Sequence, residues 1–240
     1  MMNRFFKIGF FIGITLLLIG GLLMIFSRHI KNIRVGNIII SSAVYEDSGL
    51  QLVEGNKKFE DITGIAMKVS KVNVTFEQGD EFKVEYGTYR DMLYTLEEKD
   101  NVLYIDYKHS NLTNLKYYDE QYIKIIYPKD TTFDFCNIEA FTSSISMDKM
   151  NLDSAYISAY TCNIDTEELK VNNVDIITDA SVINMKLNGK TDDYKYAMTQ
   201  NSSICKINGK SLKDYIDKSG NNDKKINIDA SSSKINFMME

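Results

Sequence analysis

The chain of 240 residues contains no tryptophan, one proline, 13 glycines and three cysteines. Fifteen tyrosines and a single proline favour a strand-rich chain with few rigid loops. The cysteines, Cys136, Cys162 and Cys205, are odd in number and take non-equivalent places in the repeat described below. They therefore do not predict a disulfide framework, and each is interpreted as a small side chain that fills space.

Histidine is also scarce, and the common catalytic motifs are missing. The two histidines are His29 and His109, and the sequence contains no His-Glu-x-x-His, Gly-x-Ser-x-Gly, Cys-x-x-Cys or phosphate-loop pattern. A Gly-Gly-x-Gly-x-Asp calcium repeat is absent as well. We therefore predict no enzymatic activity and assign no catalytic, cofactor-binding or metal-binding residue.

Charge is unevenly distributed along the chain. Residues 1–35 carry five basic side chains and no acid, whereas residues 36–240 carry 23 basic and 33 acidic residues, a net charge of −10. Nucleic-acid binding requires a concentrated basic face, so this balance argues against a nucleic-acid partner.

One long apolar run occurs near the amino terminus. Residues 8–26 contain no charge and would span about 28 Å as a helix, enough for the hydrocarbon core of a bilayer. An Ala-x-Ala-like cleavage site does not follow, and no cysteine stands nearby for lipoprotein processing. We expect an uncleaved transmembrane anchor at 8–26 within an amino-terminal segment 1–35. Basic residues on both sides nearly balance, so charge alone leaves the orientation open.

A 19-residue unit repeats three times between residues 138 and 194. The repeats begin at Ile138, Ile157 and Ile176, and the same displacement relates Ile145, Ile164 and Ile183. This period is too short for helical hairpin repeats and suits one coil of a β-solenoid, in which successive turns of chain stack.

Within each repeat, small or apolar residues recur at spacings of two, separated by spacings of three. Spacings of two mark strands and spacings of three mark corners, whereas an amphipathic helix would require spacings of three and four. The residues predicted to point inward in the middle repeat are Ile157, Ala159, Thr161, Ile164, Thr166, Leu169, Val171, Val174 and Ile176. The pattern predicts an all-β fold, a β-solenoid whose stacked coils each correspond to one repeat unit.

The β-rich region 36–240 is interpreted as one domain with three parts. Residues 36–135 form strands and hairpins, residues 136–194 form regular coils, and residues 195–240 form irregular coils and a cap. We expect 226–237 to close the stack, as terminal coils are atypical.

In the first part, alternating residues predict a hairpin between 72–76 and 82–86, a turn at 97–101 and an exposed loop at 108–121.

These segments resemble a known family. Val72–Tyr86, Asn101–Asp106 and Ile123–Pro128, followed by the Ile-rich repeats, resemble the bacterial "putative adhesin" family, domain of unknown function 4097. The resemblance covers residues 60–240 and implies a β-solenoid-like envelope protein beside a membrane segment, with the amino terminus cytoplasmic and the β domain extracellular. The sequence departs from the family in the turns, where Ser144, Asn163 and Val182 replace the glycine-containing pairs of many relatives.

Two groups of aromatic residues are candidates for a binding face. Phe141 and Tyr160 share one outward repeat position and form a possible stack, which Asp179 interrupts in the next coil. Tyr117, Tyr118 and Tyr122 lie in or beside the predicted loop. Simple cross-strand packing is the better explanation of the first pair.

Carboxylates on neighbouring coils also permit a different interpretation. β-Solenoids include polysaccharide-cleaving enzymes whose acid and base project from adjacent coils. The candidates here are Asp165, Glu167, Asp179, Glu139 and Asp153, which are also explained as solubilising charges. No acid recurs at one repeat position in all three coils.

Together these features favour a single-pass membrane protein that displays a non-enzymatic binding module in the bacterial cell envelope. Its expected partners are the bilayer, through residues 8–26, and an unknown envelope protein or glycan. The alternatives are a solenoid polysaccharide-active enzyme and a cytoplasmic, membrane-tethered regulatory protein.

Overall fold

The computed structural model describes residues 33–35, 38–40, 52–89, 94–107, 120–216 and 223–239. The chain divides into two units, residues 1–50 and 51–240. In the first unit, β1 (Ile33–Val35) and β2 (Ile38–Ile40) pair in antiparallel fashion. The apolar run 8–26 lies outside the described residues, and within them no helix is both long and apolar enough to cross a membrane.

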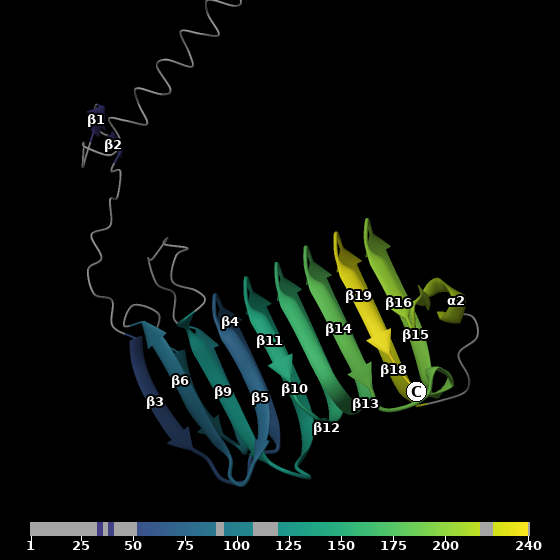
Figure 1. The fold of residues 1–240 in the computed structure, drawn as a ribbon, viewed down its shortest axis with the longest axis horizontal. Coiled ribbons are helices and arrows are strands. Elements are labelled where there is room, and N and C mark those ends of the chain that lie inside the picture. The colour runs from purple at the N-terminus through teal and green to yellow at the C-terminus, as the bar shows by residue number, and fades with distance from the viewer. Residues whose placement is uncertain are drawn as a thin grey trace, which may run out of the picture. The chain divides into compact units, whose positions relative to one another are not determined.

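The second unit is built almost entirely of strands, which confirms the all-β class (Figure 1). The strands are β3 (Leu52–Lys58), β4 (Gly64–Ser70), β5 (Asn73–Gly79), β6 (Lys83–Tyr89), β7 (Tyr94–Lys99), β8 (Val102–Tyr107), β9 (Tyr122–Pro128), β10 (Thr132–Phe141), β11 (Ser144–Met147), β12 (Met150–Tyr160), β13 (Asn163–Asp179), β14 (Val182–Leu187), β15 (Tyr194–Asn201), β16 (Ile204–Ile207), β17 (Lys210–Ser211), β18 (Lys224–Ser231) and β19 (Lys234–Met238). The described residues of this unit also include two short helices, η2 (Thr191–Asp193) and α2 (Lys213–Ile216).

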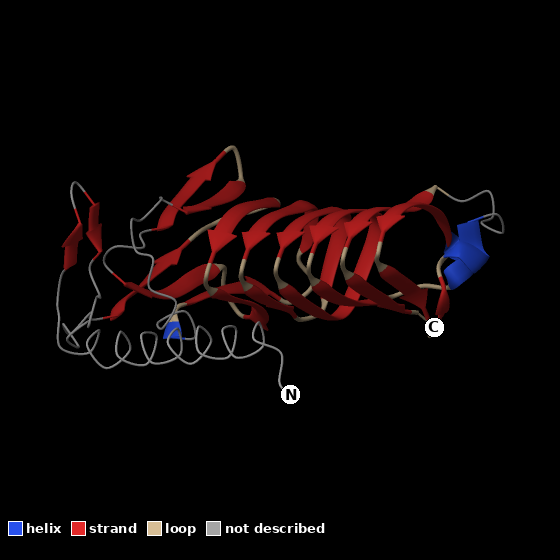
Figure 2. Cartoon of the chain, turned by 90° about the horizontal axis from the view of Figure 1, so that it is seen from above, coloured by secondary structure: helices blue, strands red, loops and turns tan. Residues whose placement is uncertain are grey.

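Successive repeats stack in parallel and in the register that the sequence predicts (Figure 2). The stacked rows are Ile138, Ile157 and Ile176 on one side of the coil, and Ile145, Ile164 and Ile183 on the next. All six side chains are at most 1% exposed. Neighbouring parallel strands lie about 4.8 Å apart, so each isoleucine packs directly on the one below.

The same ladder continues into the strands that precede the repeats. β4 pairs in parallel with β10, and β5 pairs in parallel with β11. On their other sides, β8 pairs with β4 and β9 pairs with β5, again in parallel. Strands β4, β5, β8 and β9 therefore extend the stack, although their sequence does not show the period of the repeats.

The predicted hairpin between 72–76 and 82–86 is wrong, because another strand lies between the two segments. β9 pairs in parallel with β5 and in antiparallel fashion with β6. Ile123 and Ile125 of β9 are fully buried, so this apolar strand occupies the central position.

The turn predicted at 97–101 is shorter than expected: β7 and β8 form a hairpin with only Asp100 and Asn101 at positive φ.

The last segment does not close the stack, contrary to prediction. β18 lies between β13 and β15, and β19 lies between β14 and β16, as the yellow strands of Figure 1 show. Inward residues explain this order. Ile228 and Ala230 of β18 are buried, whereas Met198 and Gln200 at the matching positions of β15 are half-buried. The polar residue Gln200 suits the end of the stack.

The corner residues also differ from the prediction. Thr161 was expected to point inward, but it is exposed and has a φ of 55°, as its counterpart Thr142 has a φ of 49°. The residue after this corner position points inward instead, which is Cys162 in the middle repeat and Ser181 in the next one. The Oγ atom of Ser181 accepts a hydrogen bond of 3.0 Å from the backbone N–H of Cys162 and donates one of 2.9 Å to the Asp179 carbonyl. The corner is thus stabilised by hydrogen bonds between coils.

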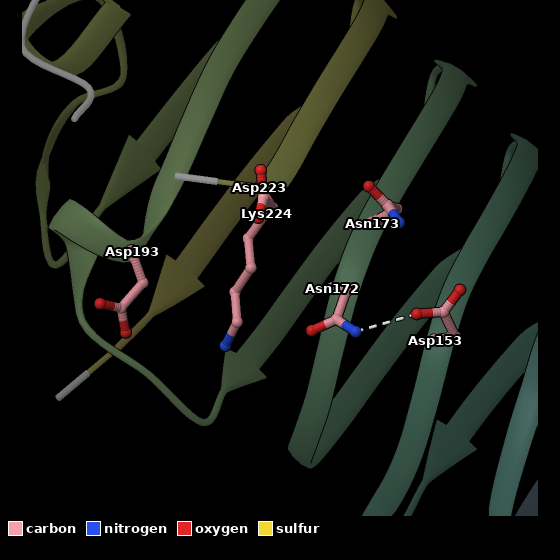
Figure 3. A pocket seen from close by; sticks show the side chains of 6 residues that line it. All are labelled: Asp153, Asn172, Asn173, Asp193, Asp223 and Lys224. Atoms are coloured by element: carbon pink, nitrogen blue, oxygen red, sulfur yellow. Dashed lines mark hydrogen bonds between the residues drawn. The ribbon is translucent and has the colours of Figure 1, made fainter. Parts of the chain in front are cut away.

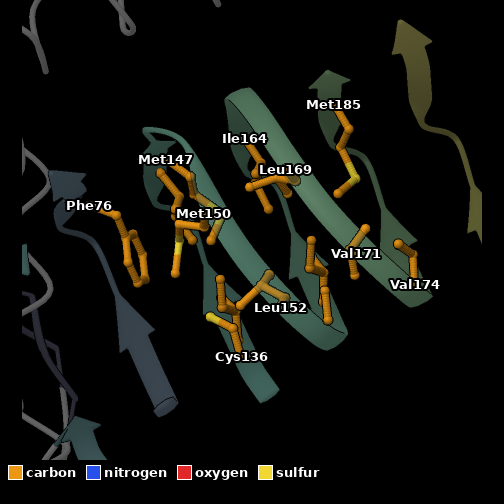
Figure 4. Packing of buried hydrophobic residues seen from close by; sticks show 14 of the residues in the cluster. Phe76, Cys136, Met147, Met150, Leu152, Ile164, Leu169, Val171, Val174 and Met185 are labelled. Atoms are coloured by element: carbon orange, nitrogen blue, oxygen red, sulfur yellow. The ribbon is translucent and has the colours of Figure 1, made fainter. Parts of the chain in front are cut away.

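Large apolar side chains fill the interior between the coils (Figure 4). The labelled members of this core are Phe76, Cys136, Met147, Met150, Leu152, Ile164, Leu169, Val171, Val174 and Met185. Each is at most 4% exposed. Because inward and outward residues alternate, burial of this row fixes which side chains face solvent on each side of the coil.

Candidate binding face

Four neighbouring strands, β10, β12, β13 and β18, present twelve outward residues in a regular grid. From strand to strand the three rows are Asn137, Tyr156, Asp175 and Asn227; Glu139, Ser158, Ile177 and Asp229; and Phe141, Tyr160, Asp179 and Ser231. We call these twelve residues the binding face.

Phe141 and Tyr160 form the predicted aromatic stack on this face. Their ring centroids are 5.5 Å apart and their planes differ by 11°. Both rings remain accessible, with exposed fractions of 39% and 44%. Aromatic pairs of this kind contribute about 0.5–1.5 kcal/mol beyond their burial. The pair therefore stands as a rigid, exposed apolar projection, and Asp179 follows it in the same row as expected.

A groove of about 390 Å³ lies on the same face, over β13, β18 and β15. Its outward lining residues are Tyr156, Asp175, Ile177, Ala197, Thr199, Asn227 and Asp229. Ile177 is 42% exposed and stands between the carboxylate of Asp175 on its own strand and that of Asp229 opposite. Sequence reasoning missed this groove, although the exposed Ile177 directly after the inward Ile176 was a visible signal.

Of the second group of predicted aromatic residues, Tyr122 does not join the face. Tyr117 and Tyr118 lie outside the described residues. Tyr122 lies on β9, where its hydroxyl donates a hydrogen bond of 3.1 Å to the Glu54 carboxylate. Burial is the main cause that raises the pKa of Tyr122, and this hydrogen bond raises the pKa further.

The carboxylates considered for polysaccharide cleavage are distributed over different sides of the coil. Glu139 and Asp179 belong to the binding face, whereas Asp165 and Glu167 lie on the first half of β13, which pairs with β11 and β14. Asp165 accepts amide hydrogen bonds of 2.7 Å from Asn163 and 2.8 Å from Asn184. These bonds give Asp165 a structural role in a ladder between coils.

Asp153 lies in a separate, polar pocket of about 590 Å³ (Figure 3). The pocket is lined by Asp153, Asn172, Asn173, Asp193, Asp223 and Lys224. The pocket lies where the neighbour of β13 changes. The pairing of β13 with β14 ends at Leu187, and its pairing with β18 begins at Asn173.

Several of the polar groups in this pocket already have partners. Asn172 donates a hydrogen bond of 2.9 Å to Asp153, and Asp193 accepts one of 2.8 Å from the Lys190 backbone. Lys224 Nζ lies 5.3 Å from the centre of the Tyr194 ring. Among the residues that the structure describes, no three acidic, histidine or cysteine side chains group as metal ligands.

All three cysteines are buried and unpaired. Burial raises the pKa of Cys136 to about 12 and also raises the pKa of Cys162 and of Cys205. A thiol in such surroundings is a poor nucleophile, in agreement with the space-filling role inferred from the sequence.

Comparison with known proteins identifies structural relatives only. No protein-family model matches the chain, and no curated protein matches it. A "putative cell adhesion protein" from Clostridium sporogenes is 14% identical, with a TM-score of 0.54, and the match covers 79% of this chain and 100% of that one. A "putative adhesin" from Bacteroides fragilis is 12% identical, with a TM-score of 0.43, over 78% of this chain and 97% of that one. At this identity the Clostridium protein shows a shared fold.

Proposed function

We propose that this chain is a non-enzymatic, adhesin-like binding module of the bacterial cell envelope. It is a β-solenoid anchored by one transmembrane helix at residues 8–26, with a cytoplasmic amino terminus and an extracellular β domain. It belongs to the family catalogued as domain of unknown function 4097.

Three features support this assignment. The parallel register of the repeats supports the solenoid, and the fold shared with the Clostridium protein supports an adhesin-like role. The uncharged run 8–26 is long enough to cross a bilayer, which supports the anchor.

The observation that carries the proposal is the exposed aromatic stack on the binding face. Aromatic side chains are enriched in the contact residues of interfaces because they bury large areas with little loss of conformational entropy. Phe141 and Tyr160 are held by strand pairing on a rigid scaffold, and both rings are accessible. The carboxylates needed for polysaccharide cleavage are, by contrast, divided between different sides of the coil.

Location is tested by adding protease to spheroplasts that express the chain with a carboxyl-terminal tag. Digestion of the tagged domain in intact spheroplasts is the expected result, because the domain is placed outside. Survival of the tag until the membrane is permeabilised would favour the cytoplasmic regulator instead.

Binding is tested by co-sedimentation of the purified 240-residue chain, solubilised in detergent, with insoluble bacterial envelopes from which the lipid has been extracted, so that residues 8–26 do not retain the chain by themselves. We expect Phe141→Ala/Tyr160→Ala to reduce the bound fraction at least fivefold. Ile204→Ala is the matched control, because Ile204 is 55% exposed and belongs to β16, away from the binding face. Equal retention of wild type and the aromatic variant would refute the role of this face.

A further inference from the structure

Three carboxylates surround one exposed isoleucine on the binding face. Asp175 and Asp179 stand two residues before and two residues after Ile177 on β13, and Asp229 on β18 pairs with Ile177. Alternate residues of a strand are about 6.6 Å apart, and adjacent strands are about 4.8 Å apart. Successive positions in the order Asp175, Asp229, Asp179 are therefore about 8 Å apart.

Two of these carboxylates are not neutralised within the described part of the chain. Asp175 accepts an amide hydrogen bond of 2.7 Å, but the side chains of Asp179 and Asp229 make no hydrogen bond or ion pair among the described residues. None of the twelve positions of the binding face carries a basic residue. Lys68 on the adjacent β4 is already paired with Glu139 at 3.3 Å.

We infer that the binding face takes an extended, cationic peptide segment of a partner protein, whose alternate lysine or arginine side chains pair with Asp175, Asp229 and Asp179. This inference rests on the proposed function and adds the chemistry of the partner. In an extended peptide, residues i, i+2 and i+4 point to one side and span about 13 Å. That span equals the backbone distance between Asp175 and Asp179, which are four residues apart on one strand.

The apolar surface between the carboxylates suits the stems of basic side chains. Lysine and arginine pack their methylene groups on apolar surface while the charged end stays in polar surroundings. Ile177, 42% exposed in the groove, provides that surface next to Asp229. Tyr160 stands beside Asp179, so a guanidinium held by Asp179 also lies within reach of an aromatic ring.

A glycan fits this geometry less well. Phe141 and Tyr160 lie nearly parallel at 5.5 Å, so each ring covers one face of the other and leaves less ring surface for stacking on a sugar. An acidic wall polymer would be repelled by Asp179 and Asp229. A neutral sugar would leave both charges without a counter-ion, whereas a basic peptide forms charge-assisted hydrogen bonds with them.

The inference is tested with two fluorescent peptides of identical composition, measured by anisotropy with the 240-residue chain. In one peptide three arginines alternate with serines, and in the other they are consecutive. We expect the alternating peptide to bind at least fivefold more tightly, because consecutive residues of an extended chain point to opposite sides. We expect its affinity to fall as salt is raised.

Asp179→Asn/Asp229→Asn should weaken binding of the alternating peptide about tenfold, since each partly exposed pair contributes a factor of roughly two to five. Glu167→Gln is the control, because it removes an exposed negative charge on another side of the coil. Equal affinity for both peptides, or an equal effect of the control, would overturn the inference.

Binding of neutral N-acetylglucosamine oligomers without binding of either peptide would also overturn the inference, while leaving the proposed function in place. If the aromatic variant also retained full co-sedimentation with envelopes, both would fail.

Discussion

Replacement of Ile164 by alanine tests the stacked interior most sharply. Ile164 is 0% exposed and lies between Ile145 and Ile183 of the adjacent coils. The change removes three carbon atoms, which lowers the transfer free energy by about 2.4 kcal/mol at about 0.8 kcal/mol for each methylene. Strand pairing on both sides holds the coils about 4.8 Å apart, so the cavity cannot collapse easily. Measured losses for such changes range from about 2 to 5 kcal/mol, and we expect about 4 kcal/mol.

The free energy of unfolding is measured by urea denaturation followed by far-ultraviolet circular dichroism. Val182→Ala is the matched control, because Val182 lies on the adjacent coil but points outward and is 39% exposed. It should lose less than about 0.5 kcal/mol. A loss below about 1 kcal/mol for Ile164→Ala would refute the reasoning, because a residue enclosed between two coils should lose about 2 kcal/mol or more.

Four further predictions follow from single residues. Thr161→Gly should stabilise the protein by about 0.5–1 kcal/mol in the same urea assay, because a left-handed φ of 55° is strained for a β-branched residue and natural for glycine. Ile164→Asp should prevent folding, whereas Asp165→Asn should cost less than about 1 kcal/mol in the urea assay, because its amide oxygen keeps one of the two exposed hydrogen bonds that the carboxylate accepts. Cys136 should not react with Ellman's reagent at pH 8 unless urea is added, because burial raises its pKa to about 12. Burial also raises the pKa of Tyr194 to about 12, so the unfolded chain loses this proton first and the urea midpoint should fall as pH rises above 10; a flat profile would contradict this.

The parallel register of the repeats could be predicted because the type of residue at each repeated position was sufficient. Isoleucine recurs at two positions of every repeat unit, and each position demands a buried apolar side chain. The aromatic stack followed from the same register, since Phe141 and Tyr160 occupy equivalent outward positions. Where the period is present, the register of the strands and the burial of their alternate residues follow from it.

Strand order outside the repeats could not be predicted, because alternation shows that a segment is a strand but does not select its neighbours. β9 lies between β5 and β6, although β7 and β8 separate it from both of them along the chain. β18 lies inside the stack because its inward row is more apolar than that of β15. This order follows only when the two segments are compared as alternatives for the same position.

The corner was misjudged because spacing alone cannot distinguish an inward residue from a left-handed one. Thr161 was assigned inward by counting, yet it and its counterpart Thr142 both adopt positive φ, and the residue that follows each of them points inward. The absence of glycine concealed the turn, since glycine is the usual marker of this conformation. The groove beside Ile177 was missed because it depends on Ala197 and Thr199 of a strand two places away.

The register of the binding face is tested most directly by cysteine cross-linking. Ser158 and Ile177 face one another across β12 and β13, about 4.8 Å apart, whereas Ser158 and Asp179 are diagonal neighbours at about 8 Å. A disulfide needs Cα atoms less than about 7 Å apart, and the native cysteines are all buried. Mild oxidation should therefore link Ser158→Cys to Ile177→Cys and leave Ser158→Cys with Asp179→Cys unlinked; the opposite result would mean that equivalent residues of successive repeats do not lie over one another.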